Sequence, residues 1–127
     1  MAKIKEEDVY RLLGETGFAR LVGAFYQQVP HDDILGPMYP KHDLAAAEHR
    51  LREFLIQRFG GPTRYSEARG HPRLRMRHAP FNIDFAARNR WIELMSTALR
   101  SAEVPAEVVE VLLPYFQNTA TQMMNQD

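Results

Sequence analysis

Apolar residues recur every three or four positions along almost the whole 127-residue chain. This spacing places them on one stripe of an α-helix, and no comparable stretch alternates strictly as a half-buried strand does. Such stripes have to meet in a shared core, so the pattern predicts an all-α fold. The stripes comprise Leu12, Leu13, Phe18, Leu21, Val22, Phe25, Tyr26 and Val29; Leu44, Ala47, Leu51, Phe54 and Leu55; Trp91, Ile92, Met95, Ala98 and Leu99; and Val108, Val109, Leu112, Leu113, Phe116 and Met123.

Capping residues, prolines and glycines indicate where the first two long helices begin and end. Thr16 is expected to cap a helix that runs to about Val29, where Pro30 stops it. Asp43 is expected to cap the next helix, and the run Gly60-Gly61-Pro62 ends it, because glycine followed by proline is a common helix stop.

The last two helices have similar signals. Asn82 or Asp84 is expected to open a long helix, and Pro105 stands at a first-turn position of the final one. Pro114 is expected to kink that final helix about one-third of the way along, because proline removes a backbone hydrogen bond and crowds the preceding turn.

The segment between Thr63 and Arg77 has no long periodic pattern and is interpreted as a loop of about 15 residues. Loops of this length in compact domains usually have a function or are mobile. The loop leads to His78, and Pro80 allows only a short helix around that histidine. Chemistry is therefore expected near His78.

Length and composition limit the classes of protein to which this chain can belong. The length fits a single domain over residues 1–127. Sixteen basic and sixteen acidic residues give a net charge of zero, which disfavours nucleic-acid binding. The absence of cysteine excludes disulfides, thiolate metal sites and a cysteine nucleophile. No apolar run resembles a signal peptide or a membrane span, so we expect a cytoplasmic protein without membrane association.

Histidine spacing favours one kind of metal site over another. His42 and His49 are seven residues apart, as are His71 and His78, and neither pair has the spacing of a zinc site. A haem iron asks only for one imidazole in an apolar cleft between helices. By spacing alone, however, a single histidine with apolar neighbours is more often structural.

Two further groups of residues have competing interpretations. Core packing explains most aromatic residues, but Tyr26, Tyr39 and Trp91 each carry a donor that needs a partner when buried, and together they could form a hydrogen-bonding pocket. The basic run from Arg69 to Arg77 is typical of a solvated face, of a nucleic-acid surface, or of arginines that bind a ligand's carboxylates.

The sequence resembles the group II truncated haemoglobins over nearly its whole length. The resemblance rests on FYQQV at 25–29, PMYPKHDLAAAEHRLREFL at 37–55, GGPTRYSEARGHPRLRMRHAPF at 60–81, and the single Trp91. It implies a shortened globin fold of two crossed antiparallel helix pairs around haem b, with a reduced first helix and a long loop before the iron ligand. The family's first glycine pair is replaced by Gly14-Glu15-Thr16-Gly17, which leaves the geometry of the first corner open.

The resemblance also implies roles for particular residues. His78 corresponds to the proximal iron ligand, and Tyr26, Tyr39 and Trp91 correspond to distal donors. Ala47 stands where many globins have a distal histidine, and Leu51 follows one turn later. The remaining candidates for the haem pocket and propionates are Phe54, Arg50, Tyr65, Arg77, Met76 and Phe81.

Three functions follow from these interpretations. The first is a haem protein that binds O2, NO, CO or other diatomic ligands, with O2 retained by strong distal hydrogen bonds. The second is a haem enzyme that oxidises nitric oxide with bound O2 or reduces peroxide, which requires a separate reductase because the chain has no flavin or nicotinamide motif. The third is a haem-free helical module that binds through residues 69–77. A monomer and a homodimer are both compatible with the sequence.

Overall fold

The structure, a computed structural model, describes residues 4–39 and 42–126. In this part of the chain there is no strand, and the all-α prediction is confirmed. Short 3-10 turns occupy Glu6–Asp8, Val29–His31 and Gly36–Met38. The α-helices are α1 (Val9–Gln28), α2 (Leu44–Arg58), α3 (Arg64–Arg69), α4 (Leu74–His78), α5 (Phe85–Ser101) and α6 (Ala106–Met123). None of the described helices is long and apolar enough to cross a membrane.

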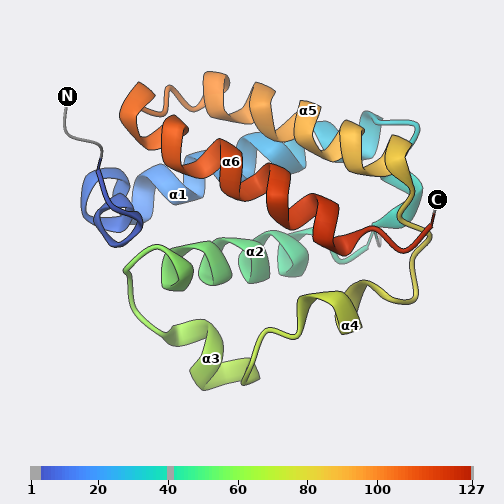
Figure 1. Cartoon of the computed structure of the whole chain (residues 1–127), viewed down its shortest axis with the longest axis horizontal. Helices are drawn as coiled ribbons and strands as arrows, with labels where there is room; N and C mark the ends of the chain where they lie inside the picture. Colours follow the sequence, from blue (N-terminus) through green and yellow to red (C-terminus); the bar gives the residue numbers. More distant parts are fainter. Residues whose placement is uncertain (1–3, 40–41, 127) are drawn as a thin grey trace.

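The four long helices form two antiparallel pairs, α1 with α2 and α5 with α6 (Figure 1). Helix α1 contacts both partners of the second pair, so the pairs share one core. The short helices α3 and α4 lie beyond α2, away from α1 (Figure 1). Helix α4 contacts α6. The shortened globin fold expected from the resemblance is therefore present.

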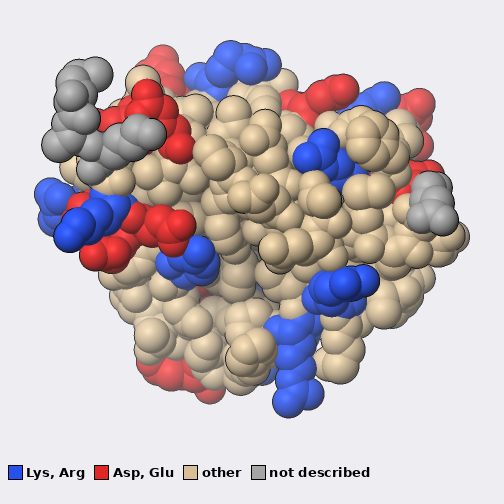
Figure 2. All heavy atoms as spheres, in the orientation of Figure 1, with Lys and Arg blue, Asp and Glu red and all other residues tan. Residues whose placement is uncertain are grey.

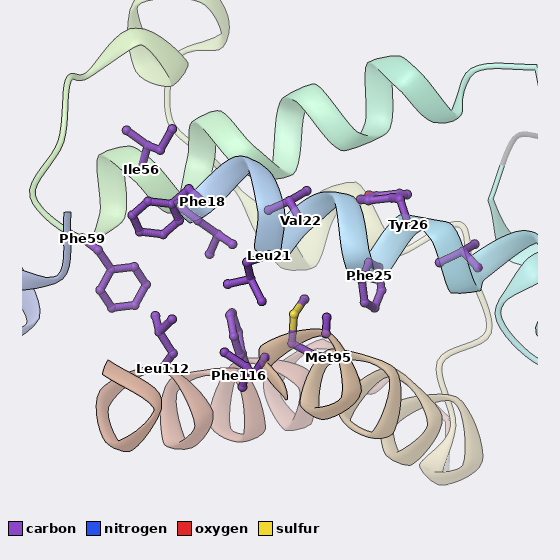
Figure 3. Close-up of a cluster of buried hydrophobic side chains, with 14 of the residues drawn as sticks. Phe18, Leu21, Val22, Phe25, Tyr26, Ile56, Phe59, Met95, Leu112 and Phe116 are labelled. Atoms are coloured by element: carbon purple, nitrogen blue, oxygen red, sulfur yellow. The ribbon is translucent and has the colours of Figure 1, made fainter. Parts of the chain in front are cut away.

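The core lies where α1 meets α5 and α6 (Figure 3). Phe18, Leu21 and Phe25 of α1 are completely buried, as are Leu112 of α6 and Met95 of α5. Figure 3 shows Phe25 pointing toward α5 and α6, whereas its neighbour Tyr26 points to the other side of α1, toward α2. Helix α1 thus contributes its apolar stripe to the core, whereas Tyr26 of the same helix lies on the other side, toward α2.

The first corner differs from the prediction based on Thr16. Helix α1 begins at Val9 and is interrupted at Gly14, whose φ of 73° and ψ of 174° are not helical. Thr16 lies inside the helical segment that follows, so it is not the cap. Glycine adopts such a positive φ without the steric cost that a side chain imposes, and it supplies the break itself. The turns before Gly14 form the reduced first helix.

The final helix also differs from the prediction. Pro114 lies about halfway along α6, and the backbone stays helical through it. Two other boundaries match: Asp84 caps α5 by accepting from the Ala87 N–H at 2.8 Å, and α2 ends at Arg58, just before the glycine pair. Pro105 is the N-cap residue of α6, one position before the first turn in which it was predicted. Asp43 occupies the N-cap position of α2 without a side-chain capping bond.

Candidate functional site

A cavity of about 510 Å³ opens between α2, the short helices α3 and α4, and the second helix pair. Figure 2 shows this side of the molecule hollowed between the level of α2 and that of α3 and α4, with Lys and Arg side chains around the hollow. The volume lies in the range of sites that take a small molecule or cofactor. Its lining includes these sequence-predicted candidates: Tyr26, Tyr39, Ala47, Arg50, Leu51, Phe54, Tyr65, Arg77, His78, Phe81 and Trp91.

His78 reaches the cavity from the last residue of α4. Its Nδ1 lies 2.7 Å from the carbonyl oxygen of Leu74, and because a carbonyl only accepts, Nδ1 has to carry the proton in this bond. The other ring nitrogen, Nε2, then keeps its lone pair in the neutral imidazole. A histidine fixed in this tautomer by a backbone carbonyl is suited to bind a metal through Nε2.

Three polar aromatic residues line the same cavity from three different elements. Tyr26 comes from α1, Tyr39 follows the turn Gly36–Met38, and Trp91 comes from α5. The rings of Tyr26 and Tyr39 meet edge to face, with centroids 5.7 Å apart. Phe25 packs against both Tyr26 and Trp91, at centroid distances of 5.2 and 5.5 Å. These contacts hold the three residues together at one end of the core.

Both tyrosines are electrically neutral at physiological pH. Burial, followed by the proximity of Tyr39, raises the pKa of Tyr26 far above its ordinary value. Burial raises the pKa of Tyr39 to about 12, and the indole of Trp91 opposes part of this shift. Among the described residues the Tyr26 hydroxyl makes no hydrogen bond. Each hydroxyl therefore keeps its proton, and that of Tyr26 is free to donate to a ligand.

Arginines from several elements surround the cavity. Arg50 lies 3.9 Å from the Asp43 carboxylate, and Arg77 donates from Nε to the Pro72 carbonyl at 2.7 Å. Arg69, the first residue of the basic run, also lines the cavity, as does Arg88, which sequence reasoning did not single out. The guanidinium groups provide a positively charged boundary that suits the carboxylates of a ligand inside.

Two of the remaining candidates are placed differently. Tyr65 is buried and packs on Phe54, with ring centroids 5.5 Å apart, so both belong to the apolar wall. Met76 is 60% exposed and lies outside the cavity lining. Leu74, Arg77 and His78 of the same helix line the cavity, but α4 turns the Met76 side chain toward solvent.

Helix α6 supplies cavity residues that sequence reasoning left out or assigned to packing. The helical spacing indicated an inward stripe that includes Phe116, but it could not indicate that part of this stripe borders open space. The lining residues on α6 are Tyr115, Phe116, Thr119, Ala120 and Met123.

A small all-helical fold of two antiparallel pairs, with a single histidine and a group of buried and half-buried hydroxyl and indole donors around one cavity, defines a truncated globin. The comparison with known families agrees: residues 8–125 match the family described as bacterial-like globin, and the chain belongs to that family. The resemblance to group II truncated haemoglobins is confirmed.

Similar proteins come from several bacteria. A group 2 truncated haemoglobin of Bacillus subtilis, YjbI, is 36% identical over 117 residues, which cover 92% of this chain and 88% of that protein. The structure of a haemoglobin from Chloroflexus aurantiacus is 46% identical, with a TM-score of 0.89 over 93% of this chain and 98% of the other. That of a truncated oxygen-avid haemoglobin from Bacillus subtilis is 35% identical, with a TM-score of 0.88 over 92% and 98%.

Globins bind haem b, and the cavity fits this group. Its walls are mainly apolar, His78 offers one free imidazole nitrogen, and arginines stand at the boundary where the propionates of a haem would need partners. Among residues 4–39 and 42–126 no three His, Asp or Glu side chains gather to hold a metal ion by themselves. The donor set is thus that of a haem pocket.

Proposed function

We propose that this chain binds haem b through His78 and retains O2 and other diatomic ligands by hydrogen bonds from Tyr26, Tyr39 and Trp91. The observation that carries the proposal is the cavity that these four residues share, with the His78 tautomer already fixed by the Leu74 carbonyl. When bound, haem supplies an iron at which a diatomic ligand is held reversibly.

The protein's own groups determine which ligand is retained. His78 would hold the cofactor through Nε2, and Arg50 and Arg77, which also line the cavity, would pair with its propionates. A ligand that develops negative charge, as O2 does, gains from the hydroxyl and indole donors more than CO does. Each such bond contributes about 1 kcal/mol or more, and about 1.4 kcal/mol slows release tenfold. The similar haemoglobin from Bacillus subtilis is described as oxygen-avid, which supports this expectation.

The first experiment is the visible spectrum of the purified chain, as isolated, after hemin addition, and after reduction under CO. We expect an intense Soret band that shifts with CO in the natural protein and is lost or altered in His78→Ala. His71→Ala is the matched control, because His71 is exposed and absent from the cavity lining. A chain that takes up no hemin would overturn the proposal.

A second candidate, nitric oxide dioxygenation or peroxide reduction, is favoured by the number of donors. A ligand released slowly is poorly suited to transport and better suited to reaction in place. Sustained nitric oxide consumption with a separate reductase would identify this activity, whereas a single turnover per haem would leave ligand binding as the function.

A further inference from the structure

We propose that Asn125 positions the proximal histidine, by fastening the segment that follows α4 to the end of α6. The inference rests on the proposed function, since it assigns to Asn125 a part in how His78 meets the cofactor. The supporting observation is a set of hydrogen bonds between two segments that are far apart in sequence, residues 78–83 after the histidine and Asn125 after α6.

Helix α4 needs such an anchor. It has only five residues, Leu74–His78, and none of them is buried. Its first flanking residue, Arg73, has a positive φ of 48° and provides no side-chain cap. A helix this short has little stability of its own, so its position depends on contacts made by neighbouring segments. On the side before the helix, Arg77 donates to the Pro72 carbonyl.

On the side after the helix, the anchor is the Asn125 side chain, which uses both ends of its amide. Nδ2 donates to the carbonyl of Phe81 at 2.8 Å and lies 3.5 Å from the carbonyl of His78 itself. Oδ1 accepts from the Ile83 N–H at 2.9 Å. The two carbonyls and the single N–H fix which end of the amide is nitrogen, because only this orientation satisfies all three.

The backbone completes this connection. The N–H groups of Asn125 and Gln126 both donate to the Ile83 carbonyl, at 3.0 and 3.2 Å. Phe81 N–H donates to the His78 carbonyl at 3.0 Å, so the turn after the histidine is closed on itself as well. The carbonyls of His78, Phe81 and Ile83 and the Ile83 N–H are therefore tied to the residues just after α6. Movement of these residues would move the histidine.

The chemistry of asparagine makes the idea testable by the exchange of one heavy atom, the amide nitrogen for an oxygen. Asn125→Asp keeps the shape of the side chain, but it replaces the donor with an oxygen that faces two carbonyl oxygens. Asn118→Asp is the matched control, because Asn118 is an exposed residue of α6, the helix that Asn125 follows, and receives the same charge. Asn125→Ala removes the side-chain bonds without adding charge and leaves the backbone bonds in place.

The experiment compares these variants in three measurements. The first is the rate of hemin transfer to an excess of apomyoglobin, which we expect to be about tenfold faster in Asn125→Asp, equivalent to about 1.4 kcal/mol, and less changed in Asn125→Ala. The second is the iron–imidazole stretching band of the reduced protein, which we expect to shift or broaden. The third is amide hydrogen exchange at Ile83 in the haem-free chain, which we expect to accelerate.

The outcomes separate this proposal from the preceding one. If the natural chain takes up no hemin, the proposed function fails, whatever the variants do. If it takes up hemin, and both Asn125 variants match Asn118→Asp in hemin loss and in the iron–imidazole band, the positioning role is wrong. If Asn125→Asp does not fold, the same two measurements on Asn125→Ala decide the matter.

Discussion

Tyr26 is a core residue by position and a cavity residue by chemistry. Its side chain is 8% exposed and its ring packs on Phe25 and Tyr39. No side-chain nitrogen or oxygen of the described residues is fully enclosed without a hydrogen-bond partner, so the Tyr26 hydroxyl opens onto the cavity. The ring therefore contributes to packing, and the hydroxyl proton is the group available to a ligand in the cavity.

This division predicts different effects of Tyr26→Phe on stability and on ligand release. We expect the unfolding free energy of the haem-free chain to change by less than about 0.5 kcal/mol, because no protein hydrogen bond is lost. We expect O2 dissociation to become about tenfold faster, and Trp91→Phe to act in the same direction. Stopped-flow O2 displacement by CO measures the rates, with Tyr10→Phe as the control outside the cavity. Unchanged rates in both variants would rule out the distal network.

Gly60 and Gly70 both have a positive φ, but their surroundings differ. Gly60 has a φ of 99°, and a Cβ there would collide with the backbone carbonyl of Glu7. Gly70 has a φ of 76°, and a Cβ there would meet nothing within 4 Å. The first glycine permits a close approach of two chain segments, and the second only the conformation of a turn.

Substitution by alanine separates these two causes. Gly70→Ala is expected to lower the unfolding free energy by about 1 kcal/mol, the strain of the backbone alone. Gly60→Ala is expected to lower it by about 3 kcal/mol or more, because the backbone of Glu7 also has to move. Urea denaturation of both variants measures the difference. Equal losses would mean that the approach of Glu7 contributes nothing.

The corner that carries Tyr39 is fastened to α5 through Arg90. Asp32 accepts from the N–H groups of Ile34 and Leu35, at 3.1 and 2.8 Å, and this shapes the turn. Its carboxylate also lies 2.6 Å from Arg90, the residue next to Trp91. The same guanidinium reaches Asp33, whose side chain is 85% exposed, whereas that of Asp32 is only 8% exposed. The pair with Asp32 is thus shielded and the other is not.

Acid is expected to weaken this fastening. Burial raises the pKa of Asp32, but hydrogen bonds from the Leu35 N–H, Arg90 and the Ile34 N–H outweigh burial and hold it below its ordinary value. A carboxylate with a depressed pKa stabilises the fold above its unfolded-state pKa, and this contribution is lost as the pH falls through the folded-state pKa.

Asp32→Asn is therefore expected to cost about 1 kcal/mol at pH 7 and progressively less in acid, where Asp32 of the natural chain is also protonated. Asp33→Asn is the matched control and is expected to have almost no effect, because exposed ion pairs contribute little. Urea denaturation from pH 7 to pH 3 follows both variants. A constant difference between Asp32→Asn and the natural chain across this range would contradict the assignment.

The long helices could be predicted from sequence because their stripes and stops are local signals. Pro30, the pair Gly60-Gly61, and Asp84 each act within a few residues of their position. Helices α3 and α4 could not be predicted in this way, since five or six residues give no periodicity and their order depends on distant partners. Asn125 is the clearest case: nothing near it in sequence indicates that it reaches the residues after His78.

Buried residues are unevenly distributed over the helices. The core joins α1, α2, α5 and α6, whereas α3 and α4 together bury one residue, Tyr65. The cavity lies between these two parts, so its far wall is held by few apolar contacts. Sequence could predict the residues of this wall by resemblance. It could not predict from periodicity that they enclose space, because a stripe that faces a cavity and a stripe that faces a helix have the same spacing.

This unevenness predicts where a protease attacks. Without haem, the wall is expected to open locally, and trypsin should cut first between Arg69 and Arg77, before the sites within α2 and α5. Saturating hemin should slow these cuts at least about tenfold, because a ligand bound only by the closed form stabilises it. Limited digestion followed by mass spectrometry identifies the order of the cuts. Equal cutting with and without hemin would contradict the prediction, because it would mean that hemin does not change how often this wall opens.

The way α5 and α6 cover α1 also sets an order of events in the cell. A growing chain leaves the ribosome with its N-terminus first, so Phe18, Leu21 and Phe25 emerge long before Leu112 and Phe116, against which this side of α1 packs (Figure 3). Until α6 has been made, this core lacks one of its walls, and the residues that fasten the segment after His78 do not yet exist. If the segment after His78 has to be fastened for the haem to be held as proposed, loading of the cofactor is expected only after α6 and Asn125 have been made.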